Sequence, residues 1–211
     1  MEIYDISIPL NDETPVWEGD RGVSISHPES ITEGDDFNVS RMEMGVHAGT
    51  HIDAPKHLFD DGYTVDQIDL KHLIGPVQVL EIPENISIIE PRHLEDHGYQ
   101  REVKRILLKT ANSNYWLSDP FSFHKEFAAI NKECAEMFAK DEFFLVGIDY
   151  FSISPFSNLK PPHEILLKSR ITILENANLS EIDAGIYNLI CLPMRITDTD
   201  GSPVRAVLTR E

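Results

Sequence analysis

Apolar and polar positions along the chain predict a substantial sheet with a few helices. Residues 77–82 alternate between apolar and polar side chains, which is typical of a strand buried on one face. Near-continuous apolar runs are typical of strands buried on both faces. Runs of that kind predict strands at 106–108, 143–148 and 186–196, and a partly alternating run predicts a further strand at 3–10.

Helical spacing is clearest within residues 125–140. The apolar residues that follow this spacing are Phe127, Ile130, Cys134, Met137 and Phe138. Shorter helices are predicted at 91–98, where a proline occupies the first turn, and at 163–170. The mixture predicts an α/β or α+β fold. No repeat or linker divides the chain, so we expect one domain over residues 1–211.

Composition and charge narrow the classes of partner. Of 211 residues, 41% are hydrophobic and 26% are charged, which is ordinary for a globular protein. The formal net charge is -18. Because binding to phosphates requires clustered Lys and Arg, we expect neither nucleic acid nor an anionic membrane surface as a partner.

The two cysteines and the chain's start predict an intracellular protein. Cys134 and Cys191 are too few for a disulfide framework, and each lies in an apolar pattern, so both are predicted to be reduced core residues. The first residues carry neither a basic region nor a long apolar run. We therefore expect a cytoplasmic location.

Candidate metal ligands gather in one short segment. His47, His51, Asp53 and His57 lie within eleven residues, and imidazole and carboxylate are common ligands of zinc. All four have odd numbers, so in an extended chain their side chains would project to the same side. Gly49 has no side chain, which would leave space for an ion between the first two histidines.

A helix fits this segment less well than a strand. His47 and His51 would share a helix face, but Asp53 would be turned away from it. Gly49 and Pro55 also disfavour a continuous helix. We therefore expect a strand that runs into a tight loop, with Pro55 at the exit. The four residues need not all be ligands, because a catalytic zinc site keeps one position open for water. His57, beyond the turn, is the candidate for proton transfer.

A second group of candidates lies further along the chain. His163 follows two prolines, and Glu175 ends the alternating run 171–175 on its apolar side. A buried carboxylate needs a partner, which a metal ion would provide. The alternative, that Glu175 begins a loop and caps the next turn, is equally compatible with the pattern. Glu164, next to His163, is a rival ligand.

These residues belong to a longer pattern that resembles the cyclase family of metal-dependent hydrolases, and most closely its bacterial kynurenine formamidases. Residues 47–57 are similar to the family signature H-x-G-T-H-x-D-x-P-x-H. The resemblance extends over nearly the whole chain. Its other segments are T-P-V-W-E-G-D at 14–20, F-N-V at 37–39, G-I-D at 147–149, I-L-E-N at 173–176, L-P at 192–193 and D-G-S-P-V-R-A-V at 200–207.

The resemblance implies two divalent metal ions per subunit. The implied ligands are His47, His51 and Asp53 for one ion, and Asp53, Glu175 and His163 for the other, with the two carboxylates bridging. Nitrogen and oxygen donors together make zinc the default ion and leave manganese possible.

It also implies an activity and an assembly. His57 would donate and accept the proton, and Trp17 would line the pocket of a small-molecule amide substrate. The implied reaction is hydrolysis of N-formyl-L-kynurenine to L-kynurenine and formate by attack of a metal-bound hydroxide. The implied fold is a swivelling β/β/α domain with a central mixed sheet, and the implied assembly is a homo-oligomer, either a dimer or a tetramer.

Three departures from the kynurenine formamidases leave the substrate open. Glu164 stands where a second histidine is common, Lys109 stands where an arginine is common, and residues 111–116 differ from the expected small polar loop. Two alternatives follow. One is a hydrolase of another aryl amide or of a cyclic amide, as in isatin hydrolase. The other is a non-catalytic metal-binding scaffold, against which His57 argues, because a binding protein needs no proton shuttle.

Overall fold

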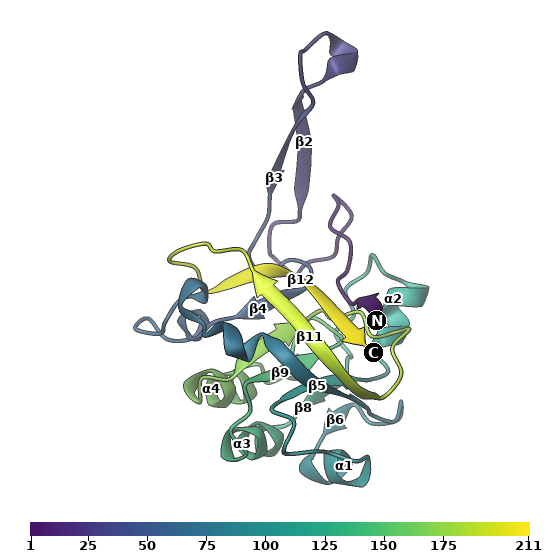
Figure 1. Cartoon of the computed structure of the whole chain (residues 1–211), viewed down its shortest axis with the longest axis vertical. Helices are drawn as coiled ribbons and strands as arrows, with labels where there is room; N and C mark the ends of the chain where they lie inside the picture. The colour runs from purple at the N-terminus through teal and green to yellow at the C-terminus, as the bar shows by residue number, and fades with distance from the viewer.

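A mixed β-sheet closes on itself into a barrel in the computed structural model, which describes residues 1–211 (Figure 1). The sheet has eight strands in the order β1-β12-β11-β5-β7-β9-β10-β4, and β12 also pairs with β4, which closes the barrel. The strands are β1 (Glu2–Asp5), β4 (His51–Asp53), β5 (Ile74–Glu81), β7 (Arg105–Lys109), β9 (Leu145–Ile148), β10 (Thr172–Glu175), β11 (Gly185–Pro193) and β12 (Gly201–Arg210).

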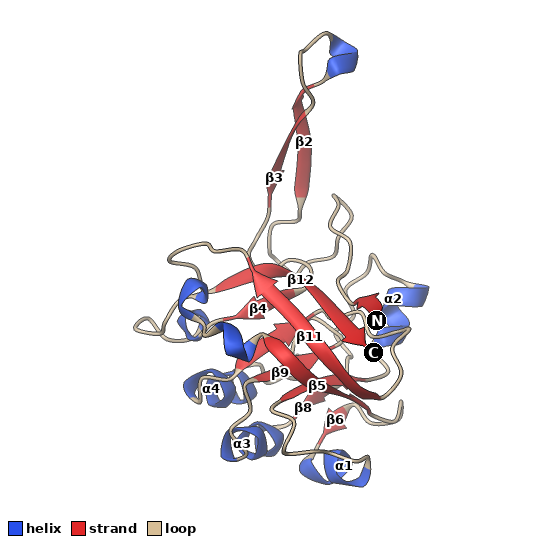
Figure 2. Ribbon diagram, viewed as in Figure 1, coloured by secondary structure: helices blue, strands red, loops and turns tan.

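Helices cover only one part of the barrel's outer surface (Figure 2). α3 and α4 pack against each other, and α4 packs against β10. No helix combines the length and apolarity that crossing a bilayer requires. The helices are α1 (Pro91–Asp96), α2 (Ser113–Ser118), α3 (Lys132–Lys140) and α4 (Lys160–Lys168), with single 3-10 turns at Ile31–Glu33, Pro55–His57, Val65–Gln67 and Leu70–His72.

Two apolar cores lie on the two sides of the sheet. Leu107, from β7, packs inside the barrel with residues of β5, β11 and β12. Its neighbours Ile106 and Leu108 point outward and pack with Phe138 of α3 and Leu166 of α4. The predictions of strands buried on both faces at 106–108 and 143–148 are confirmed, because these strands lie between the two cores. The mixed α/β class is confirmed as well. Closure of the sheet was not predicted, and the swivelling β/β/α arrangement stays a prediction.

The run at 186–196 forms a strand, but the prediction that it is buried on both faces is wrong. In β11, inward-facing residues are buried, whereas Ile186, Ile190 and Leu192 are about 40% exposed. The reason is that no helix covers this side of the barrel. The strand predicted at 3–10 is also shorter than expected: β1 ends at Asp5, and Ser7 makes only an isolated bridge.

The helix predicted at 125–140 is wrong in its first half. Ala129–Ile130 form a short strand, β8, which pairs with β6 (Ile88–Ile89), and helix α3 starts only at Lys132. The Asn131 side chain accepts a hydrogen bond from Cys134 N and caps the helix there. The helix at 91–98 is confirmed by α1, and the helix at 163–170 starts earlier, at Lys160. Both cysteines are free and buried, as predicted.

A two-stranded arm projects far from the barrel (Figure 1). Its strands are β2 (Ser24–Glu29) and β3 (Val39–Glu43), which pair in an antiparallel ladder around a 3-10 turn. None of residues 24–43 is buried. The arm joins the barrel just before the segment that carries the candidate ligands.

Candidate metal centre

Strand β4 carries two of the candidate ligands on one face. His51 and Asp53 are two residues apart, and β4 lies between β10 and β12. The register places Glu175 opposite His51, which brings the second acid to the first segment. The extended conformation expected from His47 onward is found only from His51. His47 lies in a turn, where Gly49 takes a left-handed φ of 71°, so that glycine shapes the turn.

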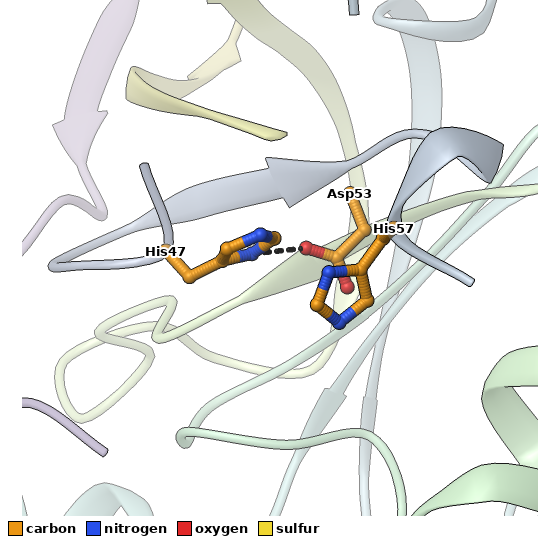
Figure 3. Close-up of side chains that lie close together, drawn as sticks. All are labelled: His47, Asp53 and His57. Atoms are coloured by element: carbon orange, nitrogen blue, oxygen red, sulfur yellow. Dashed lines mark ion pairs between the residues drawn. The ribbon is translucent and has the colours of Figure 1, made fainter. Parts of the chain in front are cut away.

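The Asp53 carboxylate lies at the middle of the cluster. Its Oδ1 is 2.8 Å from Nδ1 of His47 and 3.5 Å from Nε2 of His51 (Figure 3 shows the first of these pairs). Its Oδ2 is 3.8 Å from Nε2 of His163. Ligand atoms that share a zinc ion through bonds of about 2.0–2.2 Å stand roughly 3–3.5 Å apart. The donors around Asp53 therefore lie near the separation that a shared ion requires.

Glu175 forms the second half of the cluster. Its Oε2 is 3.5 Å from Nε2 of His51, and its Oε1 is 3.1 Å from Nε2 of His163. The backbone N–H of Ile153 donates to Oε1 at 2.7 Å, which fixes the carboxylate. The alternative, in which Glu175 begins a loop and caps the next turn, does not fit, because this residue ends buried strand β10 and its carboxylate accepts from Ile153 N.

These residues fit a divalent cation on two counts. Asp53 is 1% exposed, and neither of its carboxylate oxygens accepts a hydrogen bond. A buried carboxylate whose oxygens accept no hydrogen bond is costly, and a cation satisfies it. The donors that surround it are imidazole nitrogens and a second carboxylate, which suit zinc and manganese. Asp53 belongs to two sets of three possible ligands. One set adds His47 and His57, and the other adds His51 and Glu175.

Charge coupling within the cluster is strong. Burial lowers the pKa of His47, but the charge of Asp53 and a hydrogen bond to Asp200 outweigh burial and raise it to about 10. Burial raises the pKa of Asp53, yet the neighbouring imidazoles hold it well below its ordinary range. Burial also opposes protonation of His163, but its hydrogen bond to Glu175 raises its pKa overall. Without a metal ion, the raised pKa values of His47 and His163 favour protonated imidazoles beside the two carboxylates.

Hydrogen bonds orient the rings of the two buried histidines. Nδ1 of His51 donates to the carbonyl of Gly49 at 2.8 Å. Nδ1 of His163 donates to the carbonyl of Leu159 at 2.9 Å and lies 2.6 Å from the hydroxyl of Ser154. Since a carbonyl can only accept, both rings carry a proton on Nδ1 and present Nε2 to the carboxylates.

His57 lies at the border between the cluster and the solvent. It ends the 3-10 turn Pro55–His57, its side chain is 34% exposed, and its ring centroid is 4.3 Å from that of His47 (Figure 3). Its Nδ1 lies 3.1 Å from Oδ2 of Asp200. Asp200 was not singled out in the sequence. Its only sequence signal is that it opens the segment D-G-S-P-V-R-A-V.

A cavity of about 370 Å³ opens onto the cluster, which is the size of an ordinary small-molecule site. Trp17 forms part of its wall. It stacks on Phe156, with ring centroids 5.3 Å apart, and makes an edge contact with Phe123, with ring centroids 5.1 Å apart. The lining residues are Trp17, Asp20, His47, His51, His57, Leu58, Phe151, Ser152, Leu159, Lys160, His163 and Glu175.

Lys109 and Glu164, two of the departures from the formamidase pattern, do not line this cavity. Lys109 donates to the carbonyl of Ile182 at 2.9 Å. Glu164 does not line the cavity, whereas its neighbour His163 lines it and lies 3.1 Å from Glu175, so the rival assignment of Glu164 as a ligand finds no support. Of residues 111–116, the last four begin helix α2, and Trp116 donates to the carbonyl of Asp149.

Comparison with known proteins finds relatives that are similar over nearly the whole chain. The model of a family described as putative cyclase matches residues 4–155. Cyclase-like protein 1 from Arabidopsis thaliana is 33% identical over 218 residues, covering 99% of this chain and 85% of that protein. Kynurenine formamidase from Bacillus cereus is 35% identical over 208 residues, covering 98% of this chain and 97% of that protein.

Solved structures of related proteins have a similar fold over the whole chain. A potential metal-dependent hydrolase with cyclase activity superposes with a TM-score of 0.85 at 29% identity, covering 100% of this chain and 98% of that one. An isatin hydrolase bound to the product analogue thioisatinate superposes with a TM-score of 0.81 at 20% identity, covering 100% and 93%. The second likeness concerns the fold alone.

Proposed function

The chain belongs to the cyclase family, and on that premise we propose that it is a metal-dependent hydrolase of carbon–nitrogen bonds other than peptide bonds, acting on N-formyl-L-kynurenine. The products are L-kynurenine and formate. One observation carries the proposal: the buried Asp53 carboxylate accepts no hydrogen bond and lies among imidazole rings that line a cavity walled in part by Trp17.

Two ions fit the donors. His47, His51 and Asp53 would hold one, and Asp53, Glu175 and His163 would hold the other, with zinc as the default ion and manganese as the alternative. Divalent ions bound in such a site lower the pKa of water and polarise a carbonyl oxygen.

His57 is the group for proton transfer. Its exposure to the cavity lets it reach a substrate, and its ring lies beside the ligand His47. It takes a proton from the attacking water and passes it to the departing nitrogen, which is otherwise a poor leaving group.

The cavity wall supports an aromatic amino acid derivative as the substrate. Trp17, fixed by Phe156 and Phe123, offers an aromatic face for stacking. The cavity also carries one acid and one base outside the metal cluster, Asp20 and Lys160. This pair matches the ammonium and carboxylate of a substrate such as N-formyl-L-kynurenine.

Two alternatives compete with the formamidase assignment. A cyclic amide hydrolase, as the isatin hydrolase fold neighbour suggests, would use the same residues. A non-catalytic metal-binding scaffold would not need His57 at the cavity. Metal-loaded protein should be assayed with N-formyl-L-kynurenine and with isatin at equal concentrations. We expect the formamide to have the higher kcat/KM. No release of kynurenine from protein that binds metal would reject the formamidase assignment, and hydrolysis of isatin would then establish the alternative.

A homo-oligomer, a dimer or a tetramer, completes the proposal. The support is the β2–β3 arm, since an isolated two-stranded hairpin is at best marginally stable in water. The arm exposes Ile31, Phe37, Val39 and Met42, which are 38–69% exposed. A second copy of the chain would cover them. The cytoplasmic location stays a prediction.

A further inference from the structure

One carboxylate oxygen joins two histidines of different roles. Oδ2 of Asp200 is 2.9 Å from Nε2 of His47 and 3.1 Å from Nδ1 of His57. The first histidine is a candidate ligand and the second is the candidate for proton transfer. Both rings therefore meet on a single acceptor that lies outside the metal cluster.

The backbone holds Asp200 firmly in this position. Its carbonyl accepts a hydrogen bond from Ala54 N at 2.8 Å, and the next residue, Gly201, pairs with Asp53 in the ladder of β12 and β4. On its other side, the carbonyl of Thr199 accepts from Val65 N at 3.1 Å. The closure of the barrel thus places the carboxylate beside the segment that carries both histidines.

The two contacts select ring tautomers. An ionised carboxylate only accepts hydrogen bonds, so each ring nitrogen that faces Asp200 must carry a proton. For His57, a proton on Nδ1 leaves Nε2 with a free lone pair. For His47, a proton on Nε2 leaves Nδ1 as the ligand atom, and this is the nitrogen that lies 2.8 Å from Oδ1 of Asp53.

The same arrangement recurs at the other two histidines among the candidate ligands. His51 donates its outer nitrogen to the carbonyl of Gly49, and His163 donates its outer nitrogen to that of Leu159. His47 is the one ligand whose outer partner is a charged side chain, and the one whose partner also contacts His57. Such outer partners orient ligands and raise their basicity.

We propose that Asp200 is a positioning residue that fixes the tautomers of both His47 and His57, and so couples metal binding to the proton-transfer group. The role of His57 in proton transfer rests on the proposed function, whereas the tautomers of His47 and His57 are properties of the folded chain. Both halves are measurable without a substrate, so a failure of the formamidase assignment would leave this proposal standing.

Metal affinity tests the His47 half. Zinc dissociation constants are measured by competition with a chromophoric chelator for the wild type, Asp200→Ala and Asp200→Asn. We expect Asp200→Ala to weaken zinc binding by about 10- to 100-fold. Asp200→Asn retains an acceptor oxygen and should lose less. Asp198→Asn, in the same loop and without a side-chain partner among the hydrogen bonds, controls for loss of charge and should bind zinc as the wild type does. Equal loss in Asp198→Asn and Asp200→Ala would overturn the proposal.

Ring nitrogen NMR tests the His57 half. Long-range ¹H–¹⁵N correlation in zinc-loaded protein distinguishes a proton on Nδ1 from one on Nε2. We expect Nδ1–H in the wild type and a shift toward Nε2–H in Asp200→Ala. Nε2–H in the wild type would overturn the proposal, and this spectrum needs no variant to fold.

Discussion

The ring of His47 lies directly against the backbone of Gly201: a Cβ at position 201 would stand 2.7 Å from Cε1 of His47 and 2.9 Å from the carbonyl oxygen of Ile52. We therefore expect Gly201→Ala to push the imidazole away from Asp53 and to weaken zinc binding by about tenfold or more, a loss of the size seen when a ligand's support is removed.

Chelator competition measures this change. Gly22→Ala is the matched control, because a Cβ there meets no atom within 4 Å. If Gly201→Ala binds zinc as tightly as Gly22→Ala, the placement of His47 against β12 does not matter for the metal.

Replacement of His57 separates proton transfer from metal binding. His57→Ala should lower kcat for the amide substrate by about 100- to 10,000-fold, the usual contribution of a positioned acid–base group. Its metal content, measured by inductively coupled plasma mass spectrometry, should stay at the wild-type level. A parallel loss of metal would show instead that His57 is a ligand, as its grouping with His47 and Asp53 permits.

The stability of metal-free protein should depend on the charge of His47. Its pKa is raised from 6.5 to about 10 in the folded chain, so the folded state retains a proton that the unfolded state loses. The stabilisation is complete below pH 6.5 and is lost as the pH rises through about 10. The measurement is the difference in Tm between the wild type and His47→Asn as a function of pH. It should shrink with rising pH, and a difference that grows would contradict the assignment.

Apolar residues of the β2–β3 arm should control assembly. Truncating an aromatic anchor of an interface costs about 2 kcal/mol or more, which corresponds to roughly 30-fold weaker association. Phe37, 69% exposed near the arm's tip, is the largest such residue. Sedimentation velocity should show Phe37→Ser dissociating at concentrations where the wild type is associated. Phe121→Ser, at a site that is 56% exposed elsewhere, is the control. A wild type that sediments as a monomer would refute the assembly.

Local patterns made much of the fold predictable. The apolar runs at 106–108 and 143–148 required strands with two buried faces, and the structure has them between two cores. The run at 186–196 looked the same, but burial depends on whether a helix covers the outer face, which the run itself does not encode. At 125–140, pairing of Ala129–Ile130 with a distant strand overrode the helical spacing.

In the candidate site, too, local features were predictable and distant contacts were not. His47, His51, Asp53 and His57 are close in sequence, so their clustering was visible from spacing alone. Asp200 is 143 residues from His57 and reaches it only because β12 closes the barrel against β4. No local pattern reports that pairing, so this partner of both histidines was not found in the sequence.

Activity of metal-free protein during titration with zinc tests the central claim most directly. Hydrolysis of N-formyl-L-kynurenine should be absent before zinc is added, should rise with each addition and should level off at two equivalents per chain. Asp53→Asn, which lacks the shared carboxylate, should gain little activity over the same range. Full activity in the metal-free wild type, or a normal titration by Asp53→Asn, would contradict the account.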